Sequence, residues 1–553
     1  MSWTLRTDPS GFRTRWSDAA ASRYRAAGYW RDETLADVAR RTRDAAPDHP
    51  LLVERDRSIT RAEAWAASSR LAAFFFARGL RPGDVVSFQL PNWTEAAIIA
   101  LAARRCGLVL APIPPNYREA EVGYILQDCR AKVLFAPHVF RKHDHRRMLA
   151  GLRPEVPSLR DVVEVRGDGT AGLGWSEAVA GPPVRDEALP RLDPSAAMVV
   201  MYTSGTTGRP KGVIHTHYTF DYRVRTIVEA WSIAPSDVIF MPSPVTHITG
   251  AYWAVDIPWV SGATSVLMDV WSPEEAIDCI EKHRCTVTGG ATPFLRQLLD
   301  TAVGRPGAMA SLRIFFCGGT TVSPDLIREA AATHPHCLFF RAYGSTEMPT
   351  TTLGIRDRAD AALGAETDGE VVPPTEVKIV DLTRDAPVRD GEEGEILVRG
   401  PEQLVGYVHP EDNDAAFDAD GYFRMGDLGR RVHGRYLVIT GRKKDIIIRS
   451  GENLSPKEVE DVLAVHPAVA DVAIVAMPSR ETGEKACAFI VLRPGHTIDL
   501  AEIRRTVERA GLARQKCPEH LVVVDELPRV PSGKISKDVL RARAKEIAEQ
   551  GGT

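Results

Sequence analysis

The sequence predicts an α/β protein with a large N-terminal domain of doubly wound sheets, a small β subdomain and an α+β C-terminal domain. The chain has 553 residues, too many for one ordinary domain. Before Gly369, short apolar runs alternate with helical segments. This alternation is typical of parallel sheets that are covered on both faces. From Gly369 onwards, short strand-like segments between Gly and Pro turns replace it.

Several expected helices along the chain have N-terminal capping patterns. Three expected helices of the chain begin with a polar cap and a glutamate three residues later: Thr60 with Glu63, Asn92 with Glu95, and Ser455 with Glu458. A further helix is expected at residues 119–129. The expected strands before Gly369 are residues 85–89, 108–112, 131–136, 197–201, 237–242, 264–268, 286–289, 314–317 and 337–340.

A charged, glycine-flanked segment, residues 441–451, has the composition of a linker. We therefore place a boundary at Lys444, between an N-terminal domain of residues 1–443 and a C-terminal domain of residues 444–553, with the β subdomain at about 369–440. The elements expected around this boundary are strands at 376–381, 394–399, 469–477 and 486–492, and a helix at 500–510.

Composition excludes several classes of protein. Hydrophobic residues make up 44% and charged residues 26%, and the net charge of −4 gives no basic field, so we expect no nucleic-acid partner. The eight cysteines form no Cys-x-x-Cys pair, which favours reduced thiols and a cytoplasmic location. The most hydrophobic stretch, residues 96–113, is interrupted by Arg104 and Arg105, so no membrane span is expected.

A loop of hydroxyl-bearing residues and glycines, residues 202–212, follows the apolar run at 197–201. Glycines allow backbone N–H groups to approach an anion, hydroxyls add donors, and Lys211 adds a positive charge. This combination suits a polyphosphate, and the alternative is an ordinary polar turn. The spacing is not that of a Walker-type loop, because Pro210 precedes the lysine and Gly212 follows it.

A second cluster of functional side chains follows the strand expected at 337–340. Here Tyr343 offers a ring for stacking on adenine, and Glu347 offers a hard oxygen ligand for magnesium. Five segments, in order, resemble the motifs of the adenylate-forming (ANL) superfamily of acyl-CoA synthetases, non-ribosomal adenylation domains and luciferases: residues 202–212, 343–347, 421–427, 441–445 and 531–534. The chain looks closest to medium-chain, alicyclic or aromatic acyl-CoA ligases of the AMP-dependent type.

The resemblance implies ATP, Mg²⁺ and coenzyme A as cofactors, and it implies catalytic roles for Lys211, His247, Glu347 and Lys534. Thr203 and Glu347 would share the metal, and Lys534 would bridge the acid carboxylate and the α-phosphate. The implied nucleotide-binding residues are Thr203, Ser204, Gly205, Thr206, Thr207, Gly208, Gly319, Thr320, Tyr343, Gly344, Thr346, Asp427, Arg442 and Lys534. Asp427 would take both ribose hydroxyls, because a carboxylate offers two acceptor oxygens.

The resemblance also implies a moving C-terminal domain. Lys444 would lie at the hinge, and rotation would bring the face around Gly451 to the thiol of coenzyme A. The alternative for the basic segment around Lys444 is a solvated charge run.

The acid site is expected around His247, although a packed structural histidine is the alternative. In the family, the next residue pairs with the amine of amino acids or with hydroxybenzoates. Here it is Ile248, which can do neither, so an uncharged and mostly apolar acid is expected. The expected pocket residues are His247, Ile248, Trp253, Gly318, Gly319 and Thr320.

These features predict an acyl-CoA ligase that forms an acyl-adenylate, releases pyrophosphate and then acylates coenzyme A. Its partners would be a small carboxylic acid and coenzyme A, and a homodimer is one expectation for its assembly. One alternative is transfer to a carrier protein, an amine or another small nucleophile. The other alternative is a nucleotide-binding protein with a dead site, which Lys211, Glu347, Asp427 and Lys534 argue against.

Overall fold

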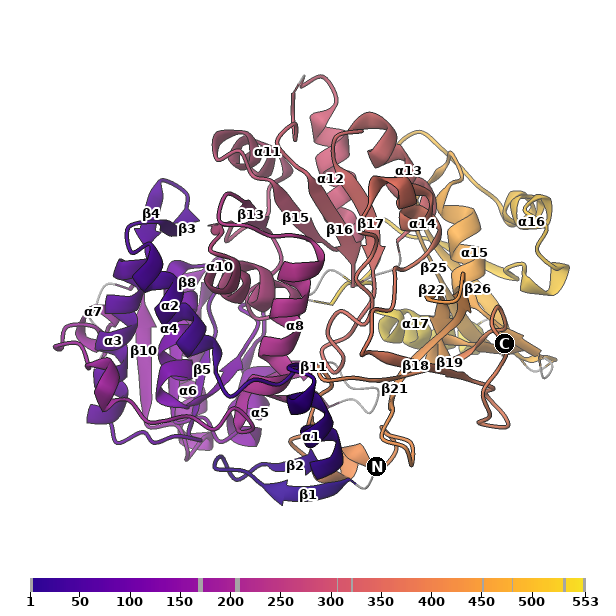
Figure 1. The fold of residues 1–553 in the computed structure, drawn as a ribbon. Helices are drawn as coiled ribbons and strands as arrows, with labels where there is room; N and C mark the ends of the chain where they lie inside the picture. Colours follow the sequence, from indigo (N-terminus) through magenta and orange to yellow (C-terminus); the bar gives the residue numbers. More distant parts are fainter. Residues whose placement is uncertain are drawn as a thin grey trace.

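The computed structural model contains two large sheets, a smaller antiparallel sheet and a separate C-terminal sheet (Figure 1). It describes residues 3–167, 173–203, 209–305, 307–319, 322–449, 452–479, 481–530 and 534–550. The predicted α/β class, with sheets that helices cover on both faces, is confirmed. An N-terminal hairpin that the sequence did not predict, β1 (Thr4–Thr7) with β2 (Arg13–Trp16), precedes the sheets.

The first large sheet contains both strands that flank the glycine-rich segment. Its central strands are parallel, whereas β11 and β12 form an antiparallel pair in which Thr203 lies opposite Lys211. Lys211 therefore begins a strand instead of lying within the loop as expected. In sheet order the strands are β10 (Asp161–Val165), β7 (Val133–Pro137), β5 (Val85–Phe88), β6 (Val109–Pro112), β11 (Ala197–Thr203), β12 (Lys211–Thr216) and β20 (Gly406–Tyr407).

The second large sheet is parallel except at one edge, where β4 pairs antiparallel with β3. The loops after its strands supply one wall of the site, as the rule for the carboxyl ends of parallel strands predicts. In sheet order the strands are β17 (Leu338–Ala342), β16 (Ile314–Gly318), β15 (Val287–Gly290), β13 (Val238–Met241), β14 (Thr264–Leu267), β3 (Pro50–Glu54) and β4 (Arg57–Thr60).

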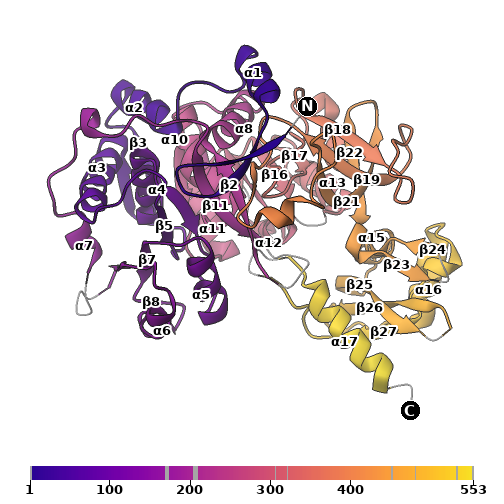
Figure 2. The same ribbon diagram turned by 90° about the horizontal axis from the view of Figure 1, so that it is seen from below.

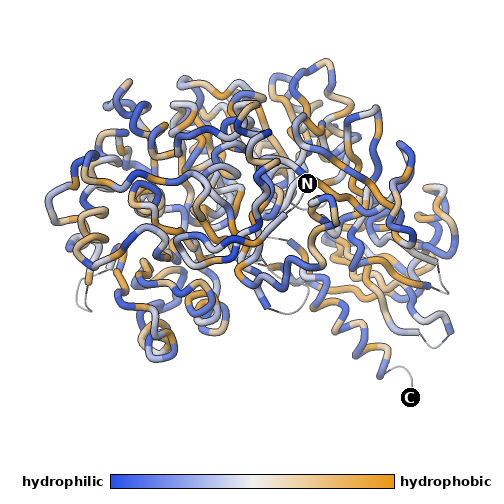
Figure 3. Tube along the Cα trace, turned by 60° about the horizontal axis from the view of Figure 1, so that its bottom comes forward, coloured by the Kyte–Doolittle hydropathy of each residue, from blue (hydrophilic) through white to orange (hydrophobic). Residues whose placement is uncertain are grey.

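Helix α4 (Thr94–Cys106) lies between the two large sheets, and every one of its residues is buried. Its two arginines are paired inside the protein: Arg104 binds Asp256 through both guanidinium ends, and Arg105 Nη2 lies 2.6 Å from Asp186 Oδ1. The interrupted hydrophobic stretch is thus a core helix. Figure 3 shows hydrophobic and hydrophilic stretches alternating along the trace, and no helix among the described residues is long and apolar enough to cross a membrane.

Further helices pack in the core between the two sheets or on their outer faces. The longer ones are α1 (Asp18–Ala26), α2 (Leu35–Ala45), α3 (Arg61–Ala77), α5 (Glu119–Asp128), α6 (His145–Leu152), α8 (His217–Ala230), α11 (Pro273–Lys282), α12 (Thr292–Ala302), α13 (Pro324–Thr333) and α14 (Ala361–Glu366). At α3 the expected capping box forms: Glu63 N donates to Thr60 Oγ1 at 3.2 Å, and Thr60 N donates to Glu63 Oε2 at 2.7 Å.

The other two expected capping boxes are wrong, because tertiary partners take the capping side chains. Trp93 is the N-cap of α4, whereas Asn92 accepts from Val245 N at 2.8 Å and donates to Ser243 O at 3.0 Å. Ser455 is the N-cap residue of α15, which begins at Pro456 as expected, but its hydroxyl donates to Thr440 O at 2.7 Å and makes no hydrogen bond to the helix. Asn92 therefore holds the loop that leads to His247.

The segment expected to be a linker is partly strand. The small sheet ends at Arg442, the residues Lys443–Asp445 form a single 3-10 turn, and the C-terminal sheet begins at Ile447. The small sheet comprises β18 (Glu376–Val380), β19 (Gly394–Arg399), β21 (Phe423–Val432) and β22 (Tyr436–Arg442).

The C-terminal unit packs its own core on both faces of its sheet and lies beside the small sheet (Figure 2). Its elements are β23 (Ile447–Arg449), β24 (Glu452–Leu454), α15 (Pro456–Ala464), β25 (Val469–Ser479), β26 (Gly483–Leu492), α16 (Leu500–Arg509), β27 (His520–Val523) and α17 (Lys537–Gln550).

Candidate active site

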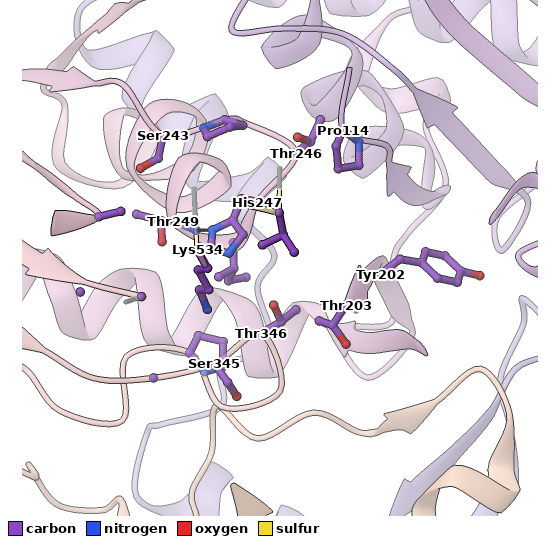
Figure 4. A pocket seen from close by; sticks show the side chains of 18 of the residues that line it. Pro114, Tyr202, Thr203, Ser243, Thr246, His247, Thr249, Ser345, Thr346 and Lys534 are labelled. Carbon is purple, nitrogen blue, oxygen red and sulfur yellow. Dashed lines mark hydrogen bonds between the residues drawn. The ribbon is translucent and has the colours of Figure 1, made fainter. Parts of the chain in front are cut away.

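A cavity of about 1290 Å³ lies where the two large sheets, the small sheet and the C-terminal unit meet. In Figure 4, Lys534 and His247 come from different parts of the chain and lie around the same space as Thr346 and Thr203. The predicted site residues that line it are Thr203, Lys211, His247, Ile248, Trp253, Gly318, Gly319, Tyr343, Gly344, Thr346, Glu347, Asp427, Arg442, Lys444 and Lys534. The predicted residues Ser204, Gly205, Thr206, Thr207, Gly208, Thr320 and Gly451 lie outside the described residues.

Asp427 is held by two neighbours on the small-sheet side of the cavity. The pairing of β21 with β22 places Asp427 opposite Arg442, and Arg442 Nε lies 3.1 Å from Asp427 Oδ1. The Tyr343 hydroxyl donates to Asp427 Oδ2 at 2.6 Å. Burial raises the pKa of Tyr343, so the phenol stays protonated and remains a donor. The carboxylate therefore has a fixed orientation toward the cavity.

Thr203, at the end of β11, and Glu347, in the segment that follows β17, bring two hard oxygen atoms together. Thr203 Oγ1 lies 3.5 Å from Glu347 Oε1, to which the Tyr407 hydroxyl donates at 3.2 Å. Beneath them, His215 Nε2 lies 2.8 Å from Thr346 O. Burial lowers the pKa of His215 to about 4, so the imidazole is neutral and donates to this carbonyl.

Lys211 extends from the first residue of β12 into the same region. Its Nζ lies 3.0 Å from Asp412 Oδ1 and 5.3 Å from the centre of the Tyr407 ring. Gly212, the next residue, has no room for a side chain, because a Cβ there would lie 2.6 Å from Val408 Cγ2. The glycine after the lysine thus lets β12 pack closely against the segment that follows β20.

Lys534 reaches the cavity from the C-terminal unit. Val530 N donates to Lys534 O at 2.8 Å, which fixes the backbone of Lys534 beside Val530. Burial, and then the positive charge of Arg442, lower the pKa of Lys534 to about 8. His247 lies across from it as the N-cap of a short helix, where its Nδ1 accepts from Thr249 N at 3.3 Å. Burial, and then the charge of Lys534, lower the pKa of His247 to about 4, so its ring is neutral.

One part of the cavity is lined by His247, Ile248 and three aromatic side chains. Trp253 is 3% exposed and stacks on Phe316, with 4.6 Å between the ring centres, and on Trp231, with 5.1 Å. These three rings form a packed aromatic wall. We call this branch the aromatic arm.

Two glycines shape the far side of the cavity. A Cβ at Gly318 would lie 2.3 Å from Ala342 O, so only glycine fits between β16 and β17 at this point. Gly319 has a φ of +78°, in the left-handed region that glycine adopts without strain.

Lys444 lies at the rim, in the 3-10 turn between the small sheet and the C-terminal sheet. Its Nζ lies 3.8 Å from Asp538 Oδ2, whose side chain is 72% exposed, so this ion pair is weak. The turn is also held by Arg541, whose Nη1 lies 2.8 Å from Asp445 Oδ1.

Comparison with known proteins shows the family to which the chain belongs. The model of the family "AMP-binding enzyme" matches residues 39–408, and that of its C-terminal domain matches residues 458–534. The chain belongs to the AMP-binding enzyme family. It is an adenylate-forming ligase of the ANL superfamily, so ATP is its nucleotide and an adenylate is its activated intermediate.

Relatives of this adenylate-forming ligase differ in their acceptors. It is 37% identical to the medium-chain fatty-acid–CoA ligase of Escherichia coli, over 95% of this chain and 94% of the relative. It is 34% identical to the salicyl-AMP ligase/salicyl-S-ArCP synthetase of Mycobacterium tuberculosis, over 94% of this chain and 92% of the relative. ATP-bound MatB from Rhodopseudomonas palustris has the same fold, with a TM-score of 0.84, 28% identity, and coverage of 93% of this chain and 99% of that one.

Several residues that shape the site of this adenylate-forming ligase were missed by the sequence analysis. His215, Tyr407 and Asp412 touch the predicted residues from distant positions, and no local pattern marks them. The aromatic residues Trp231 and Phe316 lie in apolar runs that look like ordinary core. Only the pairing of strands and loops in space reveals these five.

Proposed function

We propose that this enzyme is an acyl-CoA ligase that activates an uncharged, mostly apolar carboxylic acid. One observation carries the proposal: Lys211, Glu347, Asp427 and Lys534 line a single cavity that continues into the aromatic arm at His247. The carboxylate of the acid would lie between Lys534 and the α-phosphate of ATP. Its chain or ring would extend along Ile248 toward Trp253.

The first half-reaction needs placement of two anions and stabilisation of growing charge. An oxygen of the acid carboxylate attacks the α-phosphorus, the bond from this phosphorus to the bridging oxygen breaks, and pyrophosphate leaves. Asp427 would hold the ribose hydroxyls, and Arg442 would contact the ribose or a phosphate. Lys211 would bind the leaving phosphates, and the Lys534 ammonium would bridge the carboxylate and the α-phosphate.

The residues present fit a magnesium ion that arrives with the nucleotide. Mg²⁺ prefers one or two protein oxygens and completes its shell with phosphates and water. Glu347 and Thr203 supply such a pair of oxygens, 3.5 Å apart. When bound, the ion would neutralise phosphate charge.

The second half-reaction would follow a rotation of the C-terminal domain about Lys444. We place the two domains at residues 1–443 and 444–553 because one sheet ends at Arg442 and the next begins at Ile447. Rotation would withdraw Lys534 and present the face around Gly451 to coenzyme A. The thiol sulfur would then attack the acyl carbon, with loss of the thiol proton and of AMP as leaving group.

The aromatic arm supports an apolar acid. Ile248, Trp253 and Phe316 line the cavity with apolar side chains that offer no partner to a charged group. An ammonium group in this arm would lose its hydration and would find no polar partner in return, at a cost on the order of several kcal/mol. A screen of pyrophosphate release over acids of graded chain length and aromaticity tests this point. Preference for amino acids or salicylates would overturn it.

The acceptor is tested by supplying alternatives. We would incubate enzyme, acid and ATP without acceptor, with coenzyme A, with a phosphopantetheinylated carrier protein and with an amine, and identify the acylated product by mass. The proposal expects acyl-CoA. Acylation of the carrier protein alone would favour the second candidate function, which rests on the similarity to the salicyl-S-ArCP synthetase.

A further inference from the structure

A carboxylate lies among the cations on the phosphate side of the cavity. Asp412 belongs to a short 3-10 turn (Pro410–Asn413) and lines the cavity with its side chain 11% exposed. Its Oδ1 lies 3.0 Å from Lys211 Nζ, and its Oδ2 lies 3.3 Å from Arg209 Nη2. Each oxygen of one carboxylate thus holds a different cation at the end of the glycine-rich loop.

The turn that carries Asp412 is fastened to the strand that Lys211 begins. β20 pairs with β12, and Val408 N donates to Gly212 O at 2.8 Å. The turn itself is closed by Asn413, whose Oδ1 accepts from Tyr407 N at 3.1 Å. Asp412 therefore has little freedom to follow Lys211 if that side chain moves.

A second contact fastens the same turn to the strand on the other side of the loop. His409 Nε2 lies 2.5 Å from Asp128 Oδ1, and the Tyr202 hydroxyl donates to Asp128 Oδ2 at 2.6 Å. Tyr202 directly precedes Thr203 at the end of β11. The turn thus links both strands that flank residues 204–208.

The charges around Asp412 still leave a site for anions. Lys211, Arg209 and Asp412 together carry a net positive charge. Glu411 Oε1 also lies 3.8 Å from Arg209 Nη2, but the Glu411 side chain is 65% exposed, so solvent screens its charge. An ammonium has three N–H donors, and Asp412 occupies one of them. Lys211 can therefore bind a phosphate oxygen without leaving Asp412.

We propose that Asp412 is a positioning residue that fixes Lys211 and Arg209 for the β- and γ-phosphates of ATP. This inference rests on the proposed function, because it takes the triphosphate to lie beside Lys211. A free lysine side chain loses rotamer freedom when it is ordered, and a partner that orders it beforehand removes part of that loss. The contribution of a partly buried ion pair of about 1 kcal/mol corresponds to roughly a fivefold change in affinity.

The test compares Asp412→Asn with Asp414→Asn. Asp414 is exposed, lies two residues along the chain and makes no ion pair among the described residues, so this variant removes the same charge without the contact. We would measure the dissociation constants of ATP and AMP by calorimetry. Asp412→Asn should weaken ATP binding about fivefold and leave AMP binding unchanged, because AMP lacks the phosphates that Lys211 would meet. Asp414→Asn should change neither constant.

Three results would overturn the inference. An equal loss of ATP and AMP binding would show that Asp412 only maintains the fold. Tighter ATP binding by Asp412→Asn would show that the carboxylate competes with the triphosphate. In Lys211→Ala, the additional change Asp412→Asn should have a smaller effect than it has in the native chain, and full additivity would also contradict the inference. These constants are measured without acid or acceptor, so failure of the ligase proposal would show separately, as absence of pyrophosphate release.

Discussion

Replacing Lys534 by alanine should separate the two half-reactions. The Lys534 side chain is partly buried and lines the cavity together with Glu347 and Asp427, and burial lowers its pKa to about 8. In the proposed complex it makes two charge-assisted contacts, to the carboxylate and to the α-phosphate. Such hydrogen bonds contribute roughly 1.5–3 kcal/mol each, so adenylation should slow by about 10² to 10⁴.

The Lys534→Ala variant should retain thioester formation, the second half-reaction. Thioester formation from supplied acyl-AMP should proceed at a near-native rate, because in our account the domain rotation removes Lys534 from the cavity before the thiol attacks. ATP–pyrophosphate exchange measures the first step, and acyl-CoA formation from acyl-AMP measures the second. Lys545→Ala is the matched control, since Lys545 lies in the same domain and is 68% exposed. Equal loss of both steps in Lys534→Ala would refute the assigned role.

Three other predictions follow from single side chains. The kcat/KM for adenylation should fall above about pH 8, because a pKa of about 8 leaves only about one in ten Lys534 side chains charged at pH 9. A kcat/KM that stays constant up to pH 9.5 would contradict this prediction. Trp253→Ala should open the aromatic wall and shift the pyrophosphate-release profile toward longer or bulkier acids, whereas an unchanged profile would show that Trp253 does not limit the acid. Asp256→Asn should lower the free energy of unfolding by about 3–5 kcal/mol, as measured by thermal unfolding, because the buried charge of Arg104 in α4 loses its partner. The exposed control Asp300→Asn should change it by less than about 1 kcal/mol.

The fold class followed from the sequence because local patterns and tertiary structure agree in most elements. The strand expected at 314–317 is observed as β16, and the helix expected to begin after Thr60 begins there. The capping boxes at Asn92 and Ser455 failed for a shared reason: each side chain finds a partner distant in sequence, at Ser243 and Thr440. A cap pattern shows what a side chain can bind, whereas the fold decides which partner it meets.

The candidate site was predictable where its residues lie within continuous motifs. Tyr343 and Glu347 belong to one such segment, and both line the cavity. The partners that orient them come from elsewhere: Tyr407 binds Glu347 from a strand 60 residues further along the chain. Strand pairing sets these contacts, and a single sequence does not show which strands pair.

The aromatic arm was only half predictable. Ile248 and Trp253 were found by their places relative to His247, and the structure adds the rings against which Trp253 packs. In the sequence, Trp231 and Phe316 look like any other buried aromatic residue. Their role depends on where the core leaves a cavity, and the packing of the whole domain determines that position.

The most direct test of the central claim measures where an ¹⁸O atom of the acid carboxylate appears in the products. The claim is that a carboxylate oxygen attacks the α-phosphorus of ATP in the cavity that Lys211, Glu347, Asp427 and Lys534 line. We would supply an accepted acid labelled with ¹⁸O in its carboxylate, run the complete reaction to acyl-CoA and analyse the products by mass spectrometry. The account predicts one labelled oxygen in the phosphate of AMP and none in pyrophosphate. Label in pyrophosphate or inorganic phosphate, or its absence from AMP, would contradict it.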